Sequence, residues 1–298
     1  MNNINDFKIA VFMGGISSER EVSLRTGAAI LNSLIRQGYN AYKVELNEEN
    51  ILKAFTENEY DLAYLALHGE FGEDGRIQSV LDILGKPYTG SGVTASAVAM
   101  DKILTKKIAF LAGIRVPKTY ATLEEINEYP VIIKPAKEGS SVGLYLCKNK
   151  EAAEQALIAL KSKKPIIEEF IEGEELTAGV INGESLGVLR IKPLKGIYDY
   201  EAKYSVGGSV HEYPAKIEKS AYDEAVNGAL KIHEELGLEG ISRSDFILKN
   251  GKCYFLEVNT CPGMTETSLI PELGTIKGYK FDDLVRKMVE TFIHKNHK

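Results

Sequence analysis

The stretch that decides the fold is Ser242-Arg-Ser-Asp-Phe-Ile-Leu-Lys-Asn-Gly-Lys-Cys-Tyr-Phe-Leu-Glu-Val-Asn259. Two largely apolar runs flank Asn250-Gly251, a dipeptide typical of a two-residue β-hairpin turn because both positions accept a positive φ. The stretch therefore predicts two adjacent antiparallel strands. Working outward from this hairpin, further strand-like runs recur at 178–181 and 186–191, and helical spacing at 221–236 and 281–293. This pattern is typical of an α+β unit with an antiparallel sheet.

Polar side chains gather on one face of the predicted hairpin. Side chains alternate in direction along a strand, so Arg243 and Asp245 share a face, as do Glu257 and Asn259. Two carboxylates and a carboxamide oxygen are hard ligands that suit Mg²⁺, which also keeps water and phosphate ligands. The alternative is a solvated polar face on an edge hairpin. The apolar segment 254–256 instead indicates a central strand, which favours a metal site formed by Asp245, Glu257 and Asn259.

The length and composition exclude several classes of protein. A chain of 298 residues exceeds one hydrophobic core, so two or three domains are expected. The net charge of −6 and the lack of a long basic run argue against a nucleic-acid partner. No apolar run approaches the roughly 20 residues of a membrane span, and residues 1–7 do not resemble a signal peptide. Three cysteines without zinc-site spacing favour a reducing compartment, so we expect a cytoplasmic protein without a membrane partner.

The N-terminal part alternates between strand and helix patterns. Strands are predicted at 8–13, 41–45 and 61–67, with helices from Ser18 to Gly38 and near 49–55. This alternation predicts an open parallel sheet covered on both faces, in a first domain at 1–95. The pattern over 94–111 is helical. A second domain at 96–180 carries strands at 131–134, 142–147 and 165–170 and a helix at 151–161, and the third occupies 181–298.

A glycine-rich loop follows the strand that ends at Lys134. In Glu138-Gly-Ser-Ser-Val-Gly143, small residues let backbone N–H groups approach phosphate oxygens, and two hydroxyls add donors. An ordinary glycine-rich hairpin turn explains the loop equally well. The loop lacks the Gly-Lys-Ser/Thr ending of a Walker A motif, and Gly14-Gly15 lacks the dinucleotide-binding spacing.

Two further groups of acids follow apolar strands. Glu168 and Glu169 end one run and could form the hinge of an adenine pocket, with Glu175 near the ribose, but acids on the surface of an edge strand explain them better. Glu19 follows the first strand, where a carboxylate could hold an amine or simply favour a helix N-terminus. His68 stands at the equivalent end of its own strand, although a lone histidine is usually structural. The polar stretch 198–208 is either a lid or a surface loop.

Together these segments resemble the D-alanine–D-alanine ligases of the ATP-grasp superfamily, in order and over essentially the whole chain. The matching motifs are Gly14-Gly-Ile-Ser-Ser-Glu-Arg-Glu-Val-Ser23, Ala66-Leu-His-Gly69, Tyr88-Thr-Gly-Ser-Gly92, Met100-Asp-Lys102, Lys134-Pro135, Glu138–Gly143, Tyr200-Glu-Ala-Lys-Tyr204 and Glu257-Val-Asn-Thr-Cys-Pro-Gly-Met-Thr265. The departures are Ser244, where an apolar residue is usual, and Cys261, where serine is common. The resemblance implies a Rossmann-like pre-ATP-grasp domain followed by a two-lobed ATP-grasp fold.

The resemblance also implies roles for individual residues. ATP would be held by Lys102, Lys134, Glu138, Gly139, Ser140, Ser141, Val142, Glu168, Glu169, Phe170, Ile171, Glu175 and Lys203. Two Mg²⁺ or Mn²⁺ ions would bind Asp245, Glu257 and Asn259. The first D-alanine would lie at Glu19 and His68, the second at Ser268 and Leu269, with Arg243 and the Gly263 N–H as the oxyanion site. Glu19, Ser140 and Tyr204 would form a hydrogen-bonded triad that closes the lid.

The implied reaction joins two D-alanine molecules through an acyl phosphate, for peptidoglycan precursor synthesis, in a homodimer. Two alternatives remain open at this point. One is a D-alanine–D-lactate ligase, against which Tyr204 argues. The other is a non-catalytic nucleotide-binding protein of the same fold, against which Arg243 argues, because binding alone needs no oxyanion donor.

Overall fold

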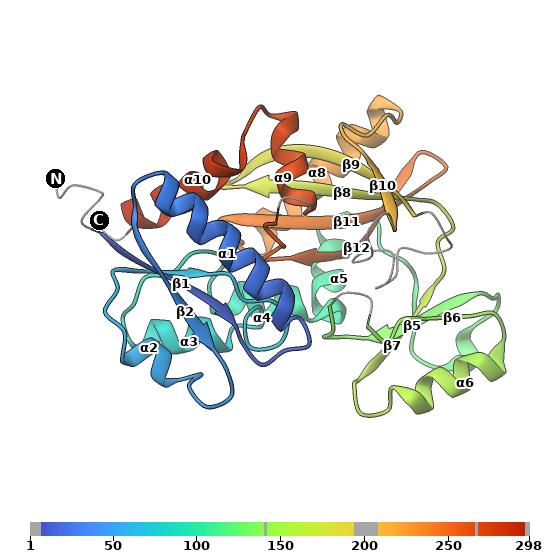
Figure 1. Ribbon diagram of the computed structural model, residues 1–298. Coiled ribbons are helices and arrows are strands. Elements are labelled where there is room, and N and C mark those ends of the chain that lie inside the picture. Colours follow the sequence, from blue (N-terminus) through green and yellow to red (C-terminus); the bar gives the residue numbers. More distant parts are fainter. Residues whose placement is uncertain (1–6, 140–141, 194–207, 266–267, 296–298) are drawn as a thin grey trace.

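The computed structural model describes residues 7–139, 142–193, 208–265 and 268–295, which form three sheets and the helices around them (Figure 1). A three-stranded parallel sheet is followed along the chain by a four-stranded and then a five-stranded antiparallel sheet. Across the described ranges, no helix combines the length and the apolar character that crossing a bilayer requires. The predicted order, a parallel unit followed by antiparallel units, is confirmed.

The N-terminal sheet has the strand order β2-β1-β3, and its central strand is buried on both faces. Its elements are β1 (Lys8–Gly14), α1 (Arg20–Arg36), β2 (Asn40–Leu46), α2 (Lys53–Thr56), β3 (Leu62–Leu65) and α3 (Arg76–Ile83). Alternate side chains of β1 enter two different cores: Ile9 and Val11 pack with residues of α1 and α10, whereas Ala10 and Phe12 pack with residues of α2 and α3. The sheet is therefore covered on both faces, as predicted.

The helical pattern predicted over 94–111 is confirmed, and the chain forms two helices there, α4 (Val93–Met100) and α5 (Lys102–Leu111). Asp101 breaks the helix with extended backbone angles, and its carboxylate accepts hydrogen bonds from the N–H groups of Ile103 and Leu104. A side chain that caps a helix N-terminus satisfies donors that have no partner within the helix. The break places Lys102 at the first position of α5.

The central sheet has the order β4-β7-β5-β6. Its elements are β4 (Thr119–Tyr120), the short 3₁₀ helix η2 (Leu123–Glu125), β5 (Val131–Pro135), β6 (Tyr145–Cys147), α6 (Lys150–Ala159) and β7 (Pro165–Glu169). Strand β7 pairs with β4 on one side and β5 on the other, so it is an interior strand. The interpretation of Glu168 as an acid on the surface of an edge strand is therefore wrong, since this side chain is only 2% exposed.

The C-terminal sheet has the order β10-β9-β8-β11-β12. Its elements are β8 (Glu174–Ile181), β9 (Glu184–Pro193), β10 (Ser209–Glu212), α8 (Lys219–Glu235), β11 (Ile241–Lys249), β12 (Lys252–Asn259), α9 (Leu269–Ile276) and α10 (Phe281–Lys295). Asn250 and Gly251 have φ angles of 51° and 73°, as the predicted two-residue turn requires. Helix α9 has no counterpart among the predicted elements.

The expectation that the strand containing Glu257 is central is wrong, because β12 lies at the edge of the described sheet (Figure 1). Its apolar residues are explained by what covers that edge. The N–H of Phe255 donates to the carbonyl of Arg115, just beyond α5, and the Phe255 ring packs edge-on against Phe246. A covered edge strand reads like a central strand in sequence, because both are shielded from water.

Candidate active site

The polar face of the β11–β12 hairpin is present as the strand alternation predicts. Arg243 lies opposite Asn259, and Asp245 lies opposite Glu257, so all four residues share a face. A β-bulge follows Asp245 and shifts the register, since Phe246 pairs with Phe255. Ser244 points to the opposite face and is 1% exposed, as expected.

Each carboxylate of this face already has a cationic partner. The Arg243 guanidinium donates two hydrogen bonds to Asp245, from Nε at 3.1 Å and Nη2 at 2.9 Å, and Thr177 Oγ1 donates to Asp245 Oδ1 at 2.8 Å. Lys102 Nζ lies 3.0 Å from Glu257 Oε2 and donates to the carbonyl of Glu138 at 2.6 Å. Arg243 is thereby fixed in direction by a two-pronged contact, and Lys102 joins the hairpin to the loop after β5.

The donor set fits a hard divalent cation. Asp245 and Glu257 offer carboxylate oxygens and Asn259 a carboxamide oxygen, all on one rigid hairpin. Among the described residues, no group of three His, Cys, Asp or Glu side chains could hold a metal ion by itself. Such a site leaves coordination positions for water and phosphate oxygens, which is typical of Mg²⁺ or Mn²⁺ sites that bind a nucleotide.

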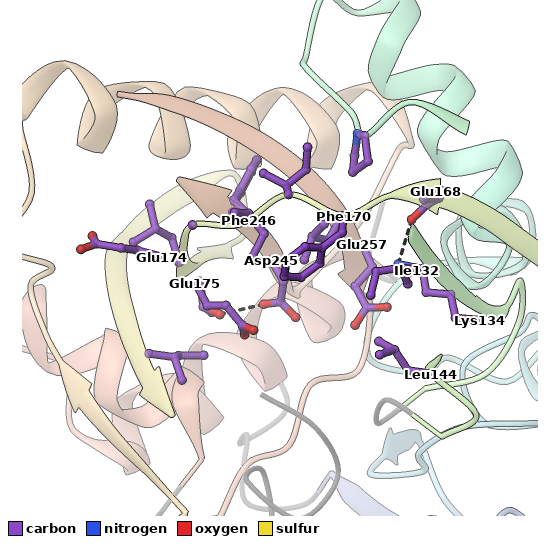
Figure 2. A pocket seen from close by; sticks show the side chains of 18 of the residues that line it. Ile132, Lys134, Leu144, Glu168, Phe170, Glu174, Glu175, Asp245, Phe246 and Glu257 are labelled. Atoms are coloured by element: carbon purple, nitrogen blue, oxygen red, sulfur yellow. Dashed lines mark hydrogen bonds and ion pairs between the residues drawn. The ribbon is translucent and has the colours of Figure 1, made fainter. Parts of the chain in front are cut away.

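A cavity of about 540 Å³ lies between the central and the C-terminal sheets, within the 300–1,000 Å³ that small-molecule sites usually occupy (Figure 2). Figure 2 shows the side chains of Asp245 and Glu257 extending into this cavity beside that of Glu175. The predicted residues that line it are Lys102, Lys134, Glu138, Val142, Glu168, Glu169, Phe170, Ile171, Glu175, Asp245 and Glu257. We call it the nucleotide-sized cavity.

A buried row of three ionisable side chains, Lys106, Glu168 and Lys134, lies at one wall of the nucleotide-sized cavity, and the last two line it. Glu168 makes ion pairs with Lys134, at 3.1 Å, and with Lys106 (Figure 2 shows the Lys134 contact). Burial opposes ionisation of Glu168, but the two lysine charges outweigh it and hold its pKa at about 2, below the ordinary value. The sequence reasoning missed Lys106, although it follows Lys102 by one helical turn, which places both on the same face of α5.

A second, smaller and more polar cavity adjoins the first, with a volume of about 170 Å³. We call it the small cavity. The predicted residues that line it are Glu19, His68, Gly139, Arg243, Glu257, Asn259, Gly263, Ser268 and Leu269. Glu257 lines both cavities, so they meet at this carboxylate. Every predicted site residue within the described ranges lines one cavity or both.

Glu19 lies against the backbone of two loops. A Cβ atom built on Gly69 would lie 2.6 Å from Glu19 Oε2, and one built on Gly139 would lie 3.2 Å from it. Gly69 also has a φ of 70°, which L-residues rarely adopt. The absence of side chains at both positions lets the Glu19 carboxylate lie between the N-terminal domain and the loop after β5.

His68 and Glu73 form the buried end of the small cavity. His68 Nδ1 lies 2.9 Å from the carbonyl oxygen of Cys261, and Nε2 lies 3.0 Å from Thr26 Oγ1. Burial lowers the pKa of His68, outweighing the charge of Glu19, so the ring is neutral at pH 7 and links the N-terminal domain to the loop after β12. Glu73, which the sequence reasoning missed, accepts a 2.6 Å hydrogen bond from the N–H of Gly69. Burial and the charge of Glu19 raise the pKa of Glu73 to about 8.

The loop after β12 approaches the N-terminus of α9 at Gly263. A Cβ atom built on Gly263 would lie 3.1 Å from Ser268 Oγ, which accepts a hydrogen bond from the N–H of Thr265 at 3.0 Å. Gly263 and Ser268, two of the predicted substrate-binding residues, are therefore close together. Four other predicted site residues, Ser140, Ser141, Lys203 and Tyr204, lie outside the described residues, as does most of the predicted lid.

Family models and curated sequences both match this chain. The model described as "D-ala D-ala ligase C-terminus" matches residues 106–290, and the one described as "D-ala D-ala ligase N-terminus" matches residues 47–91. The D-alanine–D-alanine ligase of Fusobacterium nucleatum subsp. nucleatum is 63% identical over 287 residues, which cover 96% of this chain and 99% of the relative. That of Aquifex aeolicus is 43% identical over 288 residues, covering 93% and 98%.

Solved structures match over the whole fold. The D-alanine–D-alanine ligase of Bacillus anthracis, complexed with ATP, superposes with a TM-score of 0.84 at 29% identity, covering 98% of this chain and 100% of that one. VanG D-Ala:D-Ser ligase from Enterococcus faecalis gives a TM-score of 0.83 at 28% identity, covering 96% and 99%. The predicted fold class, a parallel N-terminal domain followed by an ATP-grasp fold, is confirmed.

Proposed function

The chain belongs to the D-alanine–D-alanine ligase family and is an ATP-dependent ligase, and we propose that it joins two D-alanine molecules through an acyl phosphate. The observation that carries the proposal is the meeting of the two cavities at Glu257. One cavity has the volume expected for a nucleotide, and the other suits only small, polar molecules. A phosphate donor in the first cavity and an amino-acid carboxylate in the second would face each other at the hairpin.

In the first proposed step, the carboxylate of the first D-alanine attacks the γ-phosphorus of ATP and gives an acyl phosphate and ADP. Both reactants are anionic, so the site must supply positive charge and alignment. Lys102 and Lys134 lie in the nucleotide-sized cavity for that purpose, and Glu19 would receive the substrate ammonium. Mg²⁺ or Mn²⁺ bound by Asp245, Glu257 and Asn259 would offset the charge of the phosphate oxygens.

In the second proposed step, the amine of the second D-alanine attacks the acyl carbon, the C–N bond forms, and phosphate leaves with the former carboxylate oxygen. Arg243 and the Gly263 N–H would stabilise the negative oxygen of the tetrahedral intermediate, and one such donor is typically worth about 3–4 kcal/mol. The contact with Asp245 supports this role, because it fixes the direction of the guanidinium. Ser268 and Leu269 would bind the second D-alanine.

The remaining expectations join this proposal. Glu138 to Gly143 would cover the phosphates, with Lys203 and the Glu19–Ser140–Tyr204 triad closing the site. Glu168, Glu169, Phe170 and Ile171 would border the adenine and Glu175 the ribose. We also propose a cytoplasmic homodimer that supplies peptidoglycan precursors, with domains at 1–95, 96–180 and 181–298. The second of these boundaries falls within β8, whose sheet partners are β9 and β11.

A coupled assay of ADP release tests the proposal. With ATP and Mg²⁺, we expect ADP release that depends on D-alanine, with D-alanyl-D-alanine and phosphate as the other products. L-alanine should not replace D-alanine. D-serine and D-lactate are then offered together with limiting D-alanine, because VanG, a structural relative, is a D-Ala:D-Ser ligase. A mixed product that exceeds D-alanyl-D-alanine would contradict the proposed second substrate, and ADP release without an amino acid would contradict the ligation.

A further inference from the structure

A hydroxyl, an imidazole and a carboxylate form a hydrogen-bonded chain at the edge of the small cavity. Ser209 Oγ lies 2.9 Å from His211 Nε2, and His211 Nδ1 lies 2.7 Å from Glu272 Oε2. Ser209 and His211 belong to β10, at the edge of the described C-terminal sheet, whereas Glu272 belongs to α9. None of the three has a part in the proposed reaction. We call them the Ser209–His211–Glu272 chain.

His211 faces the part of the small cavity where the second D-alanine is proposed to bind. It lines that cavity together with Ser268, Leu269 and Arg243. The His211 and Glu272 side chains are 17% and 20% exposed, so the contact between them is largely shielded from water. Shielding strengthens a hydrogen bond to a carboxylate relative to one on an open surface.

Hydrogen bonds at both ring nitrogens fix the orientation of the imidazole. Nδ1–H donates to the Glu272 carboxylate, which leaves Nε2 to accept from the Ser209 hydroxyl. If the ring gains a proton, the hydroxyl can rotate and accept instead, so the chain remains intact. The ring therefore has one position in either protonation state, which a positioning side chain requires.

Glu272 connects this chain to the proposed binding residues of the second D-alanine. It lies in the first turn of α9, one helical turn after Ser268, and its N–H donates to the Ser268 carbonyl. The opposite side of α9 is held by apolar packing, since Ile270 and Leu273 are fully buried. His211 thus holds the polar side of the turn that presents Ser268 and Leu269.

The contact also controls where a negative charge lies. Glu19, Glu73 and Glu257 already bring carboxyl groups to the small cavity. A second amino acid carries its own carboxylate, which a freely rotating Glu272 side chain would repel. The hydrogen bond from His211 keeps the Glu272 carboxylate in one direction, and this constraint favours binding of an anionic group at Ser268.

We propose that His211 is a positioning residue for the second amino acid, acting through Glu272 on the first turn of α9. This inference rests on the proposed function, because it needs a second amino acid at Ser268 and Leu269. It predicts that loss of the His211–Glu272 contact weakens binding of the second D-alanine only. Binding of ATP and of the first D-alanine, which involve other walls of the two cavities, stays unchanged.

The test measures ADP release by the full-length enzyme over a wide range of D-alanine concentrations. The data are fitted with one saturation constant for the first D-alanine and one for the second. The KM for ATP is measured separately. In His211→Phe, the constant of the second D-alanine should rise about tenfold, the usual effect of losing a hydrogen bond to a charged group. In Glu272→Leu it should rise less, because this variant loses the same contact but also removes the carboxylate that would repel the substrate. The double variant should show no further rise, since the two side chains act as one pair. Ser209→Ala should raise the same constant about twofold.

His233→Phe is the matched control, because His233 also bonds to a serine, Ser242, but lines neither cavity. It should lower the melting temperature and leave both D-alanine constants unchanged. The inference would be overturned if His211→Phe raised both D-alanine constants and the KM for ATP equally. It would also be overturned if His211→Phe left the constant of the second D-alanine unchanged. If His211→Phe does not fold, an unchanged second constant in both Glu272→Leu and Ser209→Ala overturns it. Failure of the proposed function differs, because the wild type would then form no D-alanyl-D-alanine.

Discussion

The two cavities hold their acids in opposite ways. In the nucleotide-sized cavity, the buried Glu168 lies between two lysines and is ionised, with a pKa of about 2. In the small cavity, the buried Glu73 lies near Glu19 and has a pKa of about 8, so it is protonated at neutral pH. The difference teaches that burial alone does not decide the charge of a carboxyl group; the sign of its neighbours does. The lysines of the nucleotide-sized cavity would attract phosphates, whereas protonation of Glu73 reduces the negative charge of the small cavity.

The largest expected effect comes from Arg243, a cation that lines the small cavity. Arg243→Ala should reduce turnover about a hundredfold or more, because it removes a proposed oxyanion donor. Steady-state ADP release measures the loss, and circular dichroism checks that the fold is intact. A variant with unchanged turnover would rule out the oxyanion role. Since Arg243 also holds Asp245, the dependence on Mg²⁺ concentration should be measured in the same assay.

A large loss of stability is expected at Lys106, which lies behind the wall of the nucleotide-sized cavity and pairs with Glu168. Lys106→Met leaves Glu168 with Lys134 alone. Removing one partner of a buried ion pair costs about 3–5 kcal/mol when the other charge is left uncompensated; because Lys134 still pairs with Glu168, we expect a loss of about 1–3 kcal/mol. Urea unfolding measures the free energy. The control is Lys219→Met, which breaks the exposed Lys219–Asp223 pair on α8 and should change the free energy by less than about 1 kcal/mol. A similar loss of unfolding free energy in the two variants would mean that the buried ion pairs of Glu168 stabilise the fold no more than an exposed pair does.

The pH dependence of stability should separate the two cavities directly. The pKa of Glu73 is raised by folding from its ordinary value to about 8, so the folded protein holds a proton that the unfolded chain releases. The contribution of this proton to the free energy of unfolding is fully present below about pH 4.5 and is lost as the pH rises toward 8. The pKa of Glu168 is lowered to about 2, so its contribution is present above about pH 4.5 and is lost on acidification.

Glu73→Gln tests this difference, because glutamine keeps an acceptor for the Gly69 N–H but cannot ionise. Between pH 5 and pH 8, the free energy of unfolding should fall less in the variant than in the wild type. The difference between the two falls should be a few kcal/mol at most. Urea titrations at several pH values measure both slopes. Parallel curves would show that Glu73 is not protonated in the folded protein at neutral pH.

The parts that could be predicted from sequence are those set by local rules. Strand alternation placed Arg243, Asp245, Glu257 and Asn259 on one face, and Asn250-Gly251 identified the turn between their strands. The family resemblance supplied most of the other cavity residues. Contacts between distant segments could not be predicted: Lys106 and Glu168 are 62 residues apart, and His211 and Glu272 are 61 apart. Such pairs depend on how the sheets and helices pack, which no local pattern encodes.

The covered edge of β12 illustrates a different limit. The apolar run around Phe255 correctly indicated a strand shielded from water, but not what shields it. Neighbouring strands and a packed helix remove the same apolar area from solvent, so they leave the same pattern in sequence. Burial of Glu168 was missed for the converse reason, because its two lysine partners come from α5 and β5.

The smallest expected effect lies beneath the polar face, in two serines of β11. Ser244 and Ser242 are both 1% exposed. Ser242 has a hydrogen-bond partner, His233 Nδ1 at 2.8 Å, whereas Ser244 Oγ has no partner among the described residues. An unsatisfied buried hydroxyl destabilises a fold, so Ser244→Ala should leave the free energy of unfolding unchanged or raise it by up to about 1 kcal/mol. Ser242→Ala should lower it by about 1 kcal/mol. Turnover should be unaffected in Ser244→Ala, since this side chain points away from both carboxylates of the hairpin. A loss of activity comparable to that of Arg243→Ala would mean that the two faces of β11 are not independent.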